Sequence, residues 1–268
     1  MLLTALVGML LSTEGAVDTT TMLVSFVGLA LAMGGSAAVN HAVDQQVDRI
    51  MQRTHDRPVA TGKIPLKQAS WFAGGLIVAG LGILFVWVNT LTAVLTLFGV
   101  VGYAFIYTLY LKRATPQNIV IGGLAGAIPP LLGWTAMTGA IHPHGLLLAL
   151  LIFVWTPPHF WVLAMHRREE YAKVNIPMLP VTHGLSFTAT QVLLYTVLLV
   201  LCSLLPWITG MSSWIYATSA MLLGGVYLYY GVKLKWFPEK STAMKSFGYS
   251  ITYLLALFVA LLVDHYWA

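Results

Sequence analysis

The chain's first membrane boundary is marked by Asn40-His41-Ala42-Val43-Asp44-Gln45-Gln46-Val47-Asp48-Arg49. Residues 19–43, which lead into it, contain no Asp, Glu, Lys or Arg, whereas Arg53, Asp56 and Arg57 follow closely. A helix needs roughly 20 predominantly apolar residues to cross the hydrocarbon layer of a bilayer, and the leading run is long enough. This stretch therefore decides the fold, because it predicts a membrane-spanning helix that ends in a charged loop.

Composition assigns the whole chain to the membrane proteins. Of its 268 residues, 58% are hydrophobic and only 9% are charged, against roughly 25% charged residues in soluble domains. A net charge of +5 could indicate nucleic-acid binding, but the basic residues lie in short loops between apolar runs, so no nucleic-acid partner is expected. The single cysteine, Cys202, lies in an apolar run, which excludes a disulfide framework and a cysteine-based metal site.

Charge-free runs divide the rest of the chain into further spans. Three long runs are each expected to form a hairpin of two spans with a weak break near its middle, and a shorter run forms the last span. The long runs are 68–111, 114–166 and 174–232, the breaks are Asn89-Thr90, Gly139 to Gly145 and Thr209 to Ser213, and the last span is 246–263.

The opening run, residues 1–13, is too short to cross about 30 Å of hydrocarbon alone. We interpret it as the end of a first helix that is shortened at its N-terminus. A cleaved signal peptide is the alternative, but Met1-Leu2-Leu3 offers no basic n-region. The expected fold is thus all-α: a single polytopic domain over 1–268, with about nine transmembrane helices around a central cavity open toward the cytoplasmic face.

The basic residues predict the orientation of these spans. All 14 Lys and Arg fall in four loops, and cytoplasmic loops carry an excess of such residues. The four loops and the N-terminus are therefore expected on the cytoplasmic side of a bacterial inner membrane, including the candidate active-site loops 44–67 and 167–187. The turns within the hairpins are then outside, together with Glu14, Asp18, Asp264 and the C-terminus at Ala268.

The acidic residues of the first loop form a candidate metal site. Asn40, Asp44 and Asp48 are spaced four apart, so a continuous helix would project them from one face. Carboxylate and amide oxygens suit Mg²⁺, which proteins usually hold with one or two carboxylates plus the phosphates of a substrate. Acids contribute nothing to membrane orientation, so Asp44 and Asp48 favour a ligand set over a simple anchor.

Basic residues beside this row could bind those phosphates. Arg recognises phosphate in a planar, bidentate manner, and Lys adds a point charge. The residues concerned are Arg49, Arg53, Arg57 and Lys63. A charged loop that only anchors the helix end at the membrane surface remains an open alternative for each of them.

The third loop repeats the pattern after a span that contains a histidine. His159 lies within the span, and Arg167-Arg168-Glu169-Glu170-Tyr171 follows its end. Two acid clusters that face one cavity would let metal ions grip a diphosphate from both sides. An ionisable residue inside a span is by default a functional candidate, but a lone histidine is also often a packing group, so both readings of His159 stay open.

Five motifs, taken together, carry a resemblance. They are Asn40-x3-Asp44-x3-Asp48-Arg49-x3-Arg53-Thr54-x2-Arg57-Pro58, then Tyr107-Thr-Leu-Tyr110-Leu-Lys112-Arg113, then Gly122-Gly-Leu-Ala-Gly126-Ala-Ile-Pro129-Pro130-Leu-Leu-Gly133-Trp134, then Pro158-His159-Phe160, and finally Glu170-Tyr171 with Ile176-Pro177-Met178-Leu179-Pro180. In this order they resemble the intramembrane prenyltransferases, and within them the branch that farnesylates haem. The likeness runs from about residue 4 to the last span.

The resemblance implies a Mg²⁺-dependent transferase. Such an enzyme moves a farnesyl group from farnesyl diphosphate to a vinyl group of haem B, giving haem O for terminal oxidases, and a haem A synthase or an oxidase assembly protein is a further candidate partner. The implied metal ligands are Asn40, Asp44, Asp48 and Glu170, and the implied catalytic residues are Asp44, Asp48, Arg53, Arg57 and Glu170. The implied diphosphate-binding residues are Arg49, Lys63, Lys112, Arg113 and Arg167, and the implied pocket for haem and isoprenoid contains His159, Tyr107, Tyr110 and Trp134.

The chain departs from the family pattern at two places. It begins after the Thr-Lys-Pro-type segment that usually precedes the first helix, which puts Met1 as the natural start in doubt. Its second acid motif is Glu169-Glu170, where the family usually has Asp in the second position. Glu keeps the charge and lengthens the reach, so function should survive.

Other functions remain alternatives at this stage. A prenyltransferase for quinone or chlorophyll precursors differs only in its acceptor, although such enzymes typically carry a second DxxxD-type motif that this chain lacks. A transporter is a second alternative, but the charged residues cluster at one surface and not near the midplane, where transporter sites usually lie. A structural assembly factor is a third, and it predicts that Asp44 and Asp48 can be replaced without harm.

Overall fold

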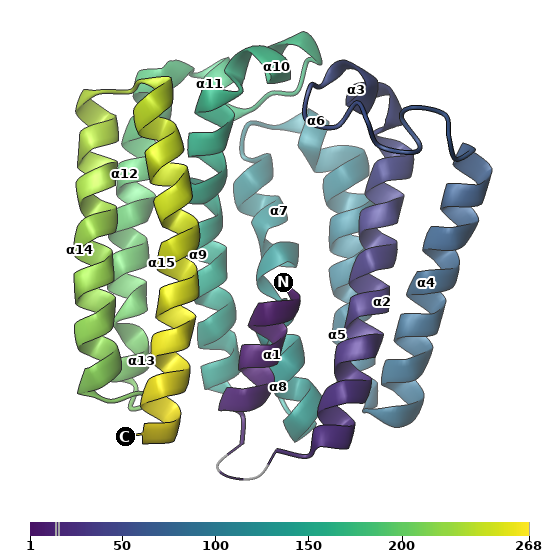
Figure 1. Cartoon of the computed structure of the whole chain (residues 1–268), viewed down its shortest axis with the longest axis vertical. Coiled ribbons are helices and arrows are strands. Elements are labelled where there is room, and N and C mark those ends of the chain that lie inside the picture. Colours follow the sequence, from purple (N-terminus) through teal and green to yellow (C-terminus); the bar gives the residue numbers. More distant parts are fainter. Residues whose placement is uncertain (14, 16, 268) are drawn as a thin grey trace.

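A computed structural model describes residues 1–13, 15 and 17–267. The expectations for Glu14 and Ala268 concern residues outside these ranges. The described residues form helices and no strand, which confirms the all-α prediction (Figure 1). Eight helical segments are long and apolar enough to cross a membrane, and the ten-residue α1, Leu2–Leu11, joins them.

The spans follow the predicted hairpin pattern. They are α2, Thr19–Val43; α4, Leu66–Trp87; α5, Thr90–Val100, continued by the π-helix η1, Val101–Leu111, and α6, Lys112–Ala114; α7, Asn118–Ala127, with α8, Pro129–Thr138; α9, Pro143–His166; α12, Gly184–Ser203, with α13, Leu205–Ile208; α14, Trp214–Trp236; and α15, Lys240–Trp267. Three short helices lie between spans: α3, Gln45–Ile50; α10, Arg168–Lys173; and α11, Leu179–Thr182. The helices therefore break where the weak breaks were predicted.

Side-chain caps explain why the helices begin at these breaks. The Asn89 carboxamide oxygen accepts a hydrogen bond from the Thr92 amide at 2.8 Å, and its nitrogen donates to the Thr135 carbonyl at 2.9 Å. The buried Asp264 carboxylate accepts hydrogen bonds from the backbone amides of Ser213 and Tyr216 at the start of α14. Both side chains satisfy helix-terminal N–H groups that have no partner within the helix.

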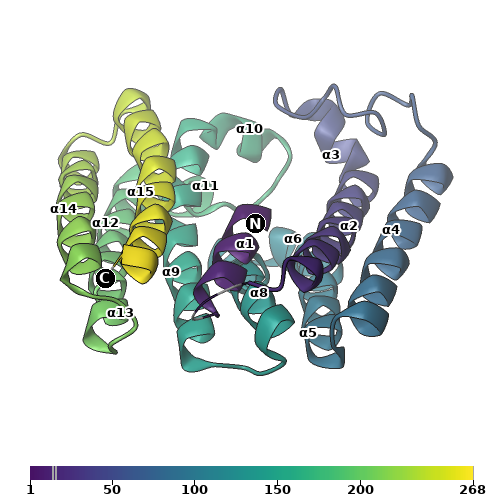
Figure 2. The same cartoon turned by 60° about the horizontal axis from the view of Figure 1, so that its bottom comes forward.

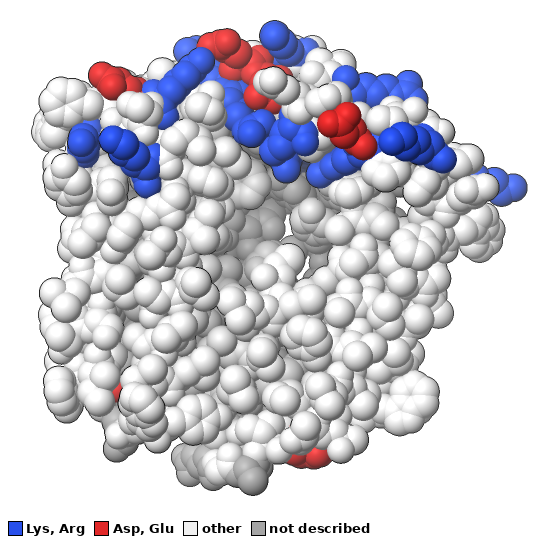
Figure 3. Space-filling view, viewed as in Figure 1, with Lys and Arg blue, Asp and Glu red and all other residues white. Residues whose placement is uncertain are grey.

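The helices surround a central region, with the charges at one end. In Figures 1 and 2, α9, α12, α14 and α15 lie on one side, α2, α4 and α5 on the other, and α1, α7 and α8 between them. Lys and Arg gather at the end where α3, α10 and α11 lie, which we call the charged face, and the surface beneath it is hollowed (Figure 3). The N-terminus at Met1 lies at mid-height, so α1 extends only from there to the opposite end (Figure 1).

Close approach of helices depends on a few small residues. A Cβ on Gly133 of α8 would lie 1.9 Å from the Ala5 carbonyl oxygen of α1, so the two backbones are in contact there. In contrast, a Cβ on Gly74 or Gly75 of α4 would meet nothing within 4 Å. A small residue is therefore needed for close helix packing at Gly133 and not at this glycine pair.

Candidate active site

The row of Asn40, Asp44 and Asp48 forms because the helical turn continues past the end of α2. The Asp44 amide donates to the Asn40 carbonyl at 2.9 Å, and the Asp48 amide donates to the Asp44 carbonyl at 2.8 Å. All three side chains therefore lie one turn apart on the same face, at the charged face of the bundle. Each is buried, with Asp44 fully so.

Asp44 is held by three neighbours. The Lys112 ammonium and the Arg113 guanidinium pair with its two oxygens, and the Asn40 amide donates to it at 2.9 Å. Both cations come from α6, which follows η1 and lies beside the end of α2. A buried carboxylate needs such compensation, because removal of a charge from water is otherwise costly.

Asp48 has its own cation within the first loop. Arg57 Nη1 donates to Asp48 Oδ2 at 2.7 Å, with Asp48 almost fully buried and Arg57 partly so. Arg49 points elsewhere, and its Nε donates to the Ala60 carbonyl at 2.8 Å, so it holds the loop in shape. Lys63 is exposed on the same loop.

The third loop approaches the first through Tyr171. Burial raises the pKa of Tyr171, and the positive charges of Arg53 and Arg167 oppose that rise, which places both cations near its hydroxyl. Met51 of the first loop and Tyr171 also belong to one buried apolar cluster. The first and third loops are therefore packed together at the charged face.

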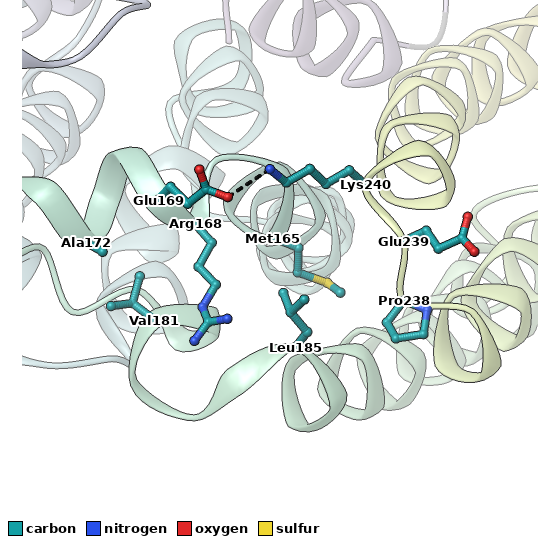
Figure 4. A pocket seen from close by; sticks show the side chains of 9 residues that line it. All are labelled: Met165, Arg168, Glu169, Ala172, Val181, Leu185, Pro238, Glu239 and Lys240. Atoms are coloured by element: carbon teal, nitrogen blue, oxygen red, sulfur yellow. Dashed lines mark hydrogen bonds and ion pairs between the residues drawn. The ribbon is translucent and has the colours of Figure 1, made fainter.

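The two glutamates of this loop point in different directions. Glu170 lies 3.4 Å from the Arg167 guanidinium and within electrostatic reach of Tyr171. Glu169 instead pairs with Lys240 at 3.0 Å, and the Lys240 hydrogen bond and charge lower its pKa. The Glu169 pair lies over a separate pocket of about 300 Å³ that Met165, Leu185 and Pro238 line (Figure 4). Of the pair Glu169-Glu170, only Glu170 remains a candidate for the site.

We call the row of Asn40, Asp44 and Asp48, with its paired cations, the charged row. Beneath it is a mainly apolar cavity of about 340 Å³. Tyr103 and Tyr107 of η1 line it on one side, stacked with ring centroids 5.9 Å apart, and His159 of α9 lines the other. Tyr103 is within electrostatic reach of Asp44, Arg53 and Arg57, which links the cavity to the charged row. Gly122 lets Tyr107 occupy its position, since a Cβ there would lie 2.2 Å from the tyrosine ring.

Two predicted pocket residues lie outside this cavity. The Tyr110 side chain is 68% exposed on the outer surface of η1. Trp134 is buried at the end of the bundle opposite the charged face, where it stacks on His142 with ring centroids 5.4 Å apart. The structure thus brings His159 and Tyr107 together and does not bring Tyr110 or Trp134 to them.

His159 is held in a defined orientation. Its ring lies between Trp155, at a centroid distance of 4.1 Å, and Phe247, at 4.7 Å. Its Nδ1 lies 2.7 Å from Ser250 Oγ, and that hydroxyl donates its one proton to the Phe247 carbonyl. The tautomer that fits this geometry has the proton on Nδ1, which donates to Ser250 Oγ, and a free lone pair on Nε2.

Several of these neighbours were not predicted from the sequence. Tyr103 could have been found, because it lies four residues before Tyr107 and shares its spacing along the span. Ser250 and Phe247 of α15 carry no local signal, since their contact with His159 spans about a third of the chain. Among the described residues, no three His, Cys, Asp or Glu side chains are grouped closely enough to hold an ion by themselves.

The family of this chain follows from a match that covers almost its whole length. The sequence profile of the UbiA prenyltransferase family matches residues 1–262. The chain belongs to the UbiA prenyltransferase family. It is therefore an integral membrane enzyme that transfers prenyl groups, in agreement with the prediction.

Curated relatives are similar in sequence to this UbiA-family chain over nearly its whole length. The protoheme IX farnesyltransferase of Alcanivorax borkumensis is 62% identical over 99% of this chain and 88% of its own length. The protein of the same name from Colwellia psychrerythraea is 56% identical over 100% of this chain and 87% of its own length.

Solved structures share the UbiA fold at low sequence identity. The structure of a digeranylgeranylglyceryl phosphate synthase has a TM-score of 0.84 at 21% identity, covering 98% of this chain and 92% of that one. A UbiA homologue from Archaeoglobus fulgidus bound to DMAPP and Mg²⁺ has a TM-score of 0.65 at 15% identity, covering 97% of this chain and 94% of that one. These likenesses establish the fold.

Proposed function

We propose that this UbiA-family enzyme transfers the farnesyl group of farnesyl diphosphate to a vinyl group of haem B and so forms haem O. The observation that carries the proposal is the 62% identity, over 99% of the chain, to a relative named protoheme IX farnesyltransferase. The site supports it independently, because a row of acids and cations lies above an apolar cavity that contains an oriented histidine.

Mg²⁺ fits the donor set of the charged row. Asn40, Asp44 and Asp48 offer hard oxygen ligands on one face, and Glu170 of the third loop is the further candidate ligand, since Glu169 pairs with Lys240. Asp44 and Asp48 stay buried only because basic side chains compensate their charge, as an ion would also do. When bound there, Mg²⁺ would neutralise the diphosphate and stabilise it as a leaving group.

The basic side chains would also stabilise diphosphate as the leaving group. Arg53, Arg57, Lys112 and Arg113 lie within or beside the row, where they would bind the diphosphate oxygens as the C–O bond breaks. Lys63 and Arg167 lie on the two loops that border the site and would add positive charge, whereas Arg49 holds the first loop. Arg57, Lys112 and Arg113 are already held in place by Asp48 and Asp44, so they would need little reorganisation.

The cavity would shelter the allylic cation and position the acceptor. Tyr103 and Tyr107 present ring faces on which a cation can be stabilised, and the apolar walls exclude bulk water. His159 keeps its Nε2 lone pair directed away from Ser250, so it would ligate or orient the haem iron of the acceptor. The vinyl carbon is a weak nucleophile, so catalysis would depend mainly on how the acceptor is positioned against the cation.

A reconstituted assay tests the proposal. The enzyme in liposomes receives haem B, farnesyl diphosphate and Mg²⁺, and the haem product is followed by mass, with Asp44→Asn as a parallel sample. We expect a haem that has gained a farnesyl group and the hydroxyl of one water, with release of diphosphate and a proton, and we expect this product to be absent in the variant and in EDTA. Diphosphate release without a haem product would keep the transferase and refute haem B as its acceptor, and no release would contradict the proposed reaction.

The orientation and membrane belong to the same proposal. The charged face, with both active-site loops, would lie on the cytoplasmic side of a bacterial inner membrane, and the C-terminus outside. Farnesyl diphosphate and haem B are both amphiphilic, so a site at the membrane boundary suits them. A haem A synthase or an oxidase assembly protein remains the candidate recipient of the product.

A further inference from the structure

A groove of about 850 Å³ lies beside the charged row but outside it. It is lined by the α2–α3 segment, the first part of α4, η1, Arg113 of α6 and Val174, which follows α10. Six large apolar side chains from α2, α3, α4 and η1 line it. They are Val39, Val43, Val47, Leu66, Ile77 and Phe105.

The rim of the groove is polar and positively charged. Arg113, Gln45 and Gln46 line it near the charged face, and its lining contains no acidic residue. The Arg113 side chain is 48% exposed, although one of its nitrogens lies 3.4 Å from Asp44. The rest of its guanidinium is therefore free to bind a second anion, and Arg suits phosphate in particular.

The groove lies at the membrane boundary, which favours an amphiphilic ligand. Gly74 and Ser70 of α4 lie in it, and the neighbouring Trp71 and Phe72 are largely exposed, as expected for a helix that faces lipid. A ligand here would place its head at the membrane boundary beside Arg113 and its tail along Ile77 and Phe105. A cationic head would meet only positive charge, so the head must be anionic.

We propose that this groove is a binding site for one anionic phospholipid. The phosphate would bind Arg113 with the two glutamine amides, and an acyl chain would lie over Gly74. Because Arg113 also pairs with Asp44, the bound lipid would share this cation with the charged row. The site does not depend on which acceptor the enzyme uses.

Two adjacent glycines provide a matched pair of variants. A Cβ on either Gly74 or Gly75 would meet nothing within 4 Å, so both positions accept a larger side chain without a clash. Gly74 lines the groove and Gly75 does not. Leu also has a higher helix propensity than Gly at both positions, so neither variant should impair folding.

Native mass spectrometry of the full chain would measure the lipid directly. The protein is extracted in mild detergent from membranes that contain phosphatidylglycerol and phosphatidylethanolamine. We expect wild type and Gly75→Leu to retain one phosphatidylglycerol each, and Gly74→Leu to retain about tenfold less. Added phosphatidylglycerol should raise the Tm of delipidated wild type and leave that of Gly74→Leu unchanged, since only a bound ligand stabilises.

Other results would overturn the proposal. Equal retention by both variants would show that the groove does not hold the lipid, and equal retention of phosphatidylethanolamine would remove the role of charge. If farnesyl diphosphate displaced the lipid and Gly74→Leu raised its KM, the groove would belong to the prenyl donor instead. The two retention results are independent of whether haem is the acceptor, because lipid retention is measured without turnover.

Discussion

At the scale of single residues, the pairing of Asp44 with Lys112 couples stability to activity. The Asp44 side chain is 1% exposed and that of Lys112 15%. Asp44→Asn leaves the cation without its partner, which we expect to cost about 3–5 kcal/mol and to lower product formation at least about 100-fold. Thermal unfolding in detergent and the haem product assay would measure the two effects.

A double variant separates the two roles of this pair. In Asp44→Asn/Lys112→Met no buried charge is left unpaired, so most of the lost stability should return while activity stays absent. Recovery of both would mean that the carboxylate only supports folding. Recovery of neither would mean that the pair does not account for the stability change.

His159 is expected to act on the acceptor and not on the fold. His159→Ala removes the Nε2 lone pair, so haem affinity and turnover should fall together, while diphosphate binding by the charged row should be unchanged. His159→Gln keeps a donor to Ser250 and part of the ring's volume, and it serves as the control for packing. Spectroscopic haem titration and product mass would report the result, and unchanged haem affinity in His159→Ala would exclude the role.

Which site residues could be predicted depends on how local their geometry is. Asn40, Asp44 and Asp48 were predictable because one helical repeat relates them. The partner of Asp44 was not, since Lys112 lies 68 residues away along the chain. Tyr110 was assigned to the pocket by the family resemblance, and the apolar run around it does not show which side of the span it faces.

At the scale of elements, the contact of α7 with η1 positions Tyr107. A Cβ on Gly122 would lie 2.2 Å from the rigid tyrosine ring, so Gly122→Ala must displace that ring or separate the helices. We expect it to lower the free energy of unfolding by about 1–3 kcal/mol and to reduce turnover more than donor binding. Thermal unfolding and a comparison of kcat with KM would measure this.

Gly126→Ala is the control for this change. It lies one turn further along α7, where a Cβ meets nothing within 4 Å. Removal of a helical glycine should there stabilise the protein by up to about 1 kcal/mol. If both variants changed stability equally, the contact with Tyr107 would not be what restricts the size of the side chain at position 122.

The helices themselves were more predictable than their contacts. Breaks at Asn89, Gly139 and Thr209 follow from polar and glycine residues in otherwise charge-free runs, and the structure has helix ends there. The π-helical turn of η1 had no such signal, because its residues are as apolar as those of a regular span. Its irregular turn changes which of Tyr103, Tyr107 and Tyr110 face the cavity.

At the scale of the whole molecule, the one-sided distribution of charge predicts how the chain lies in the membrane. The basic loops occupy one end of the bundle, whereas Thr209 lies in a turn at the other (Figures 1 and 3). The single cysteine, Cys202, is buried, so a Cys202→Ala chain can carry one new exposed cysteine at a time. Thr61→Cys in the first loop and Thr209→Cys are suitable positions, since both side chains are exposed.

An impermeant maleimide then reports the side of each position. Cytoplasmic loops carry the excess of Lys and Arg, so Thr61→Cys should react only in inverted membrane vesicles and Thr209→Cys only in right-side-out vesicles. The unmodified chain should react in neither, because Cys202 is inaccessible. The reverse pattern would place the charged row outside the cell, away from cytoplasmic prenyl diphosphates, and would therefore contradict the proposed reaction as well as the orientation.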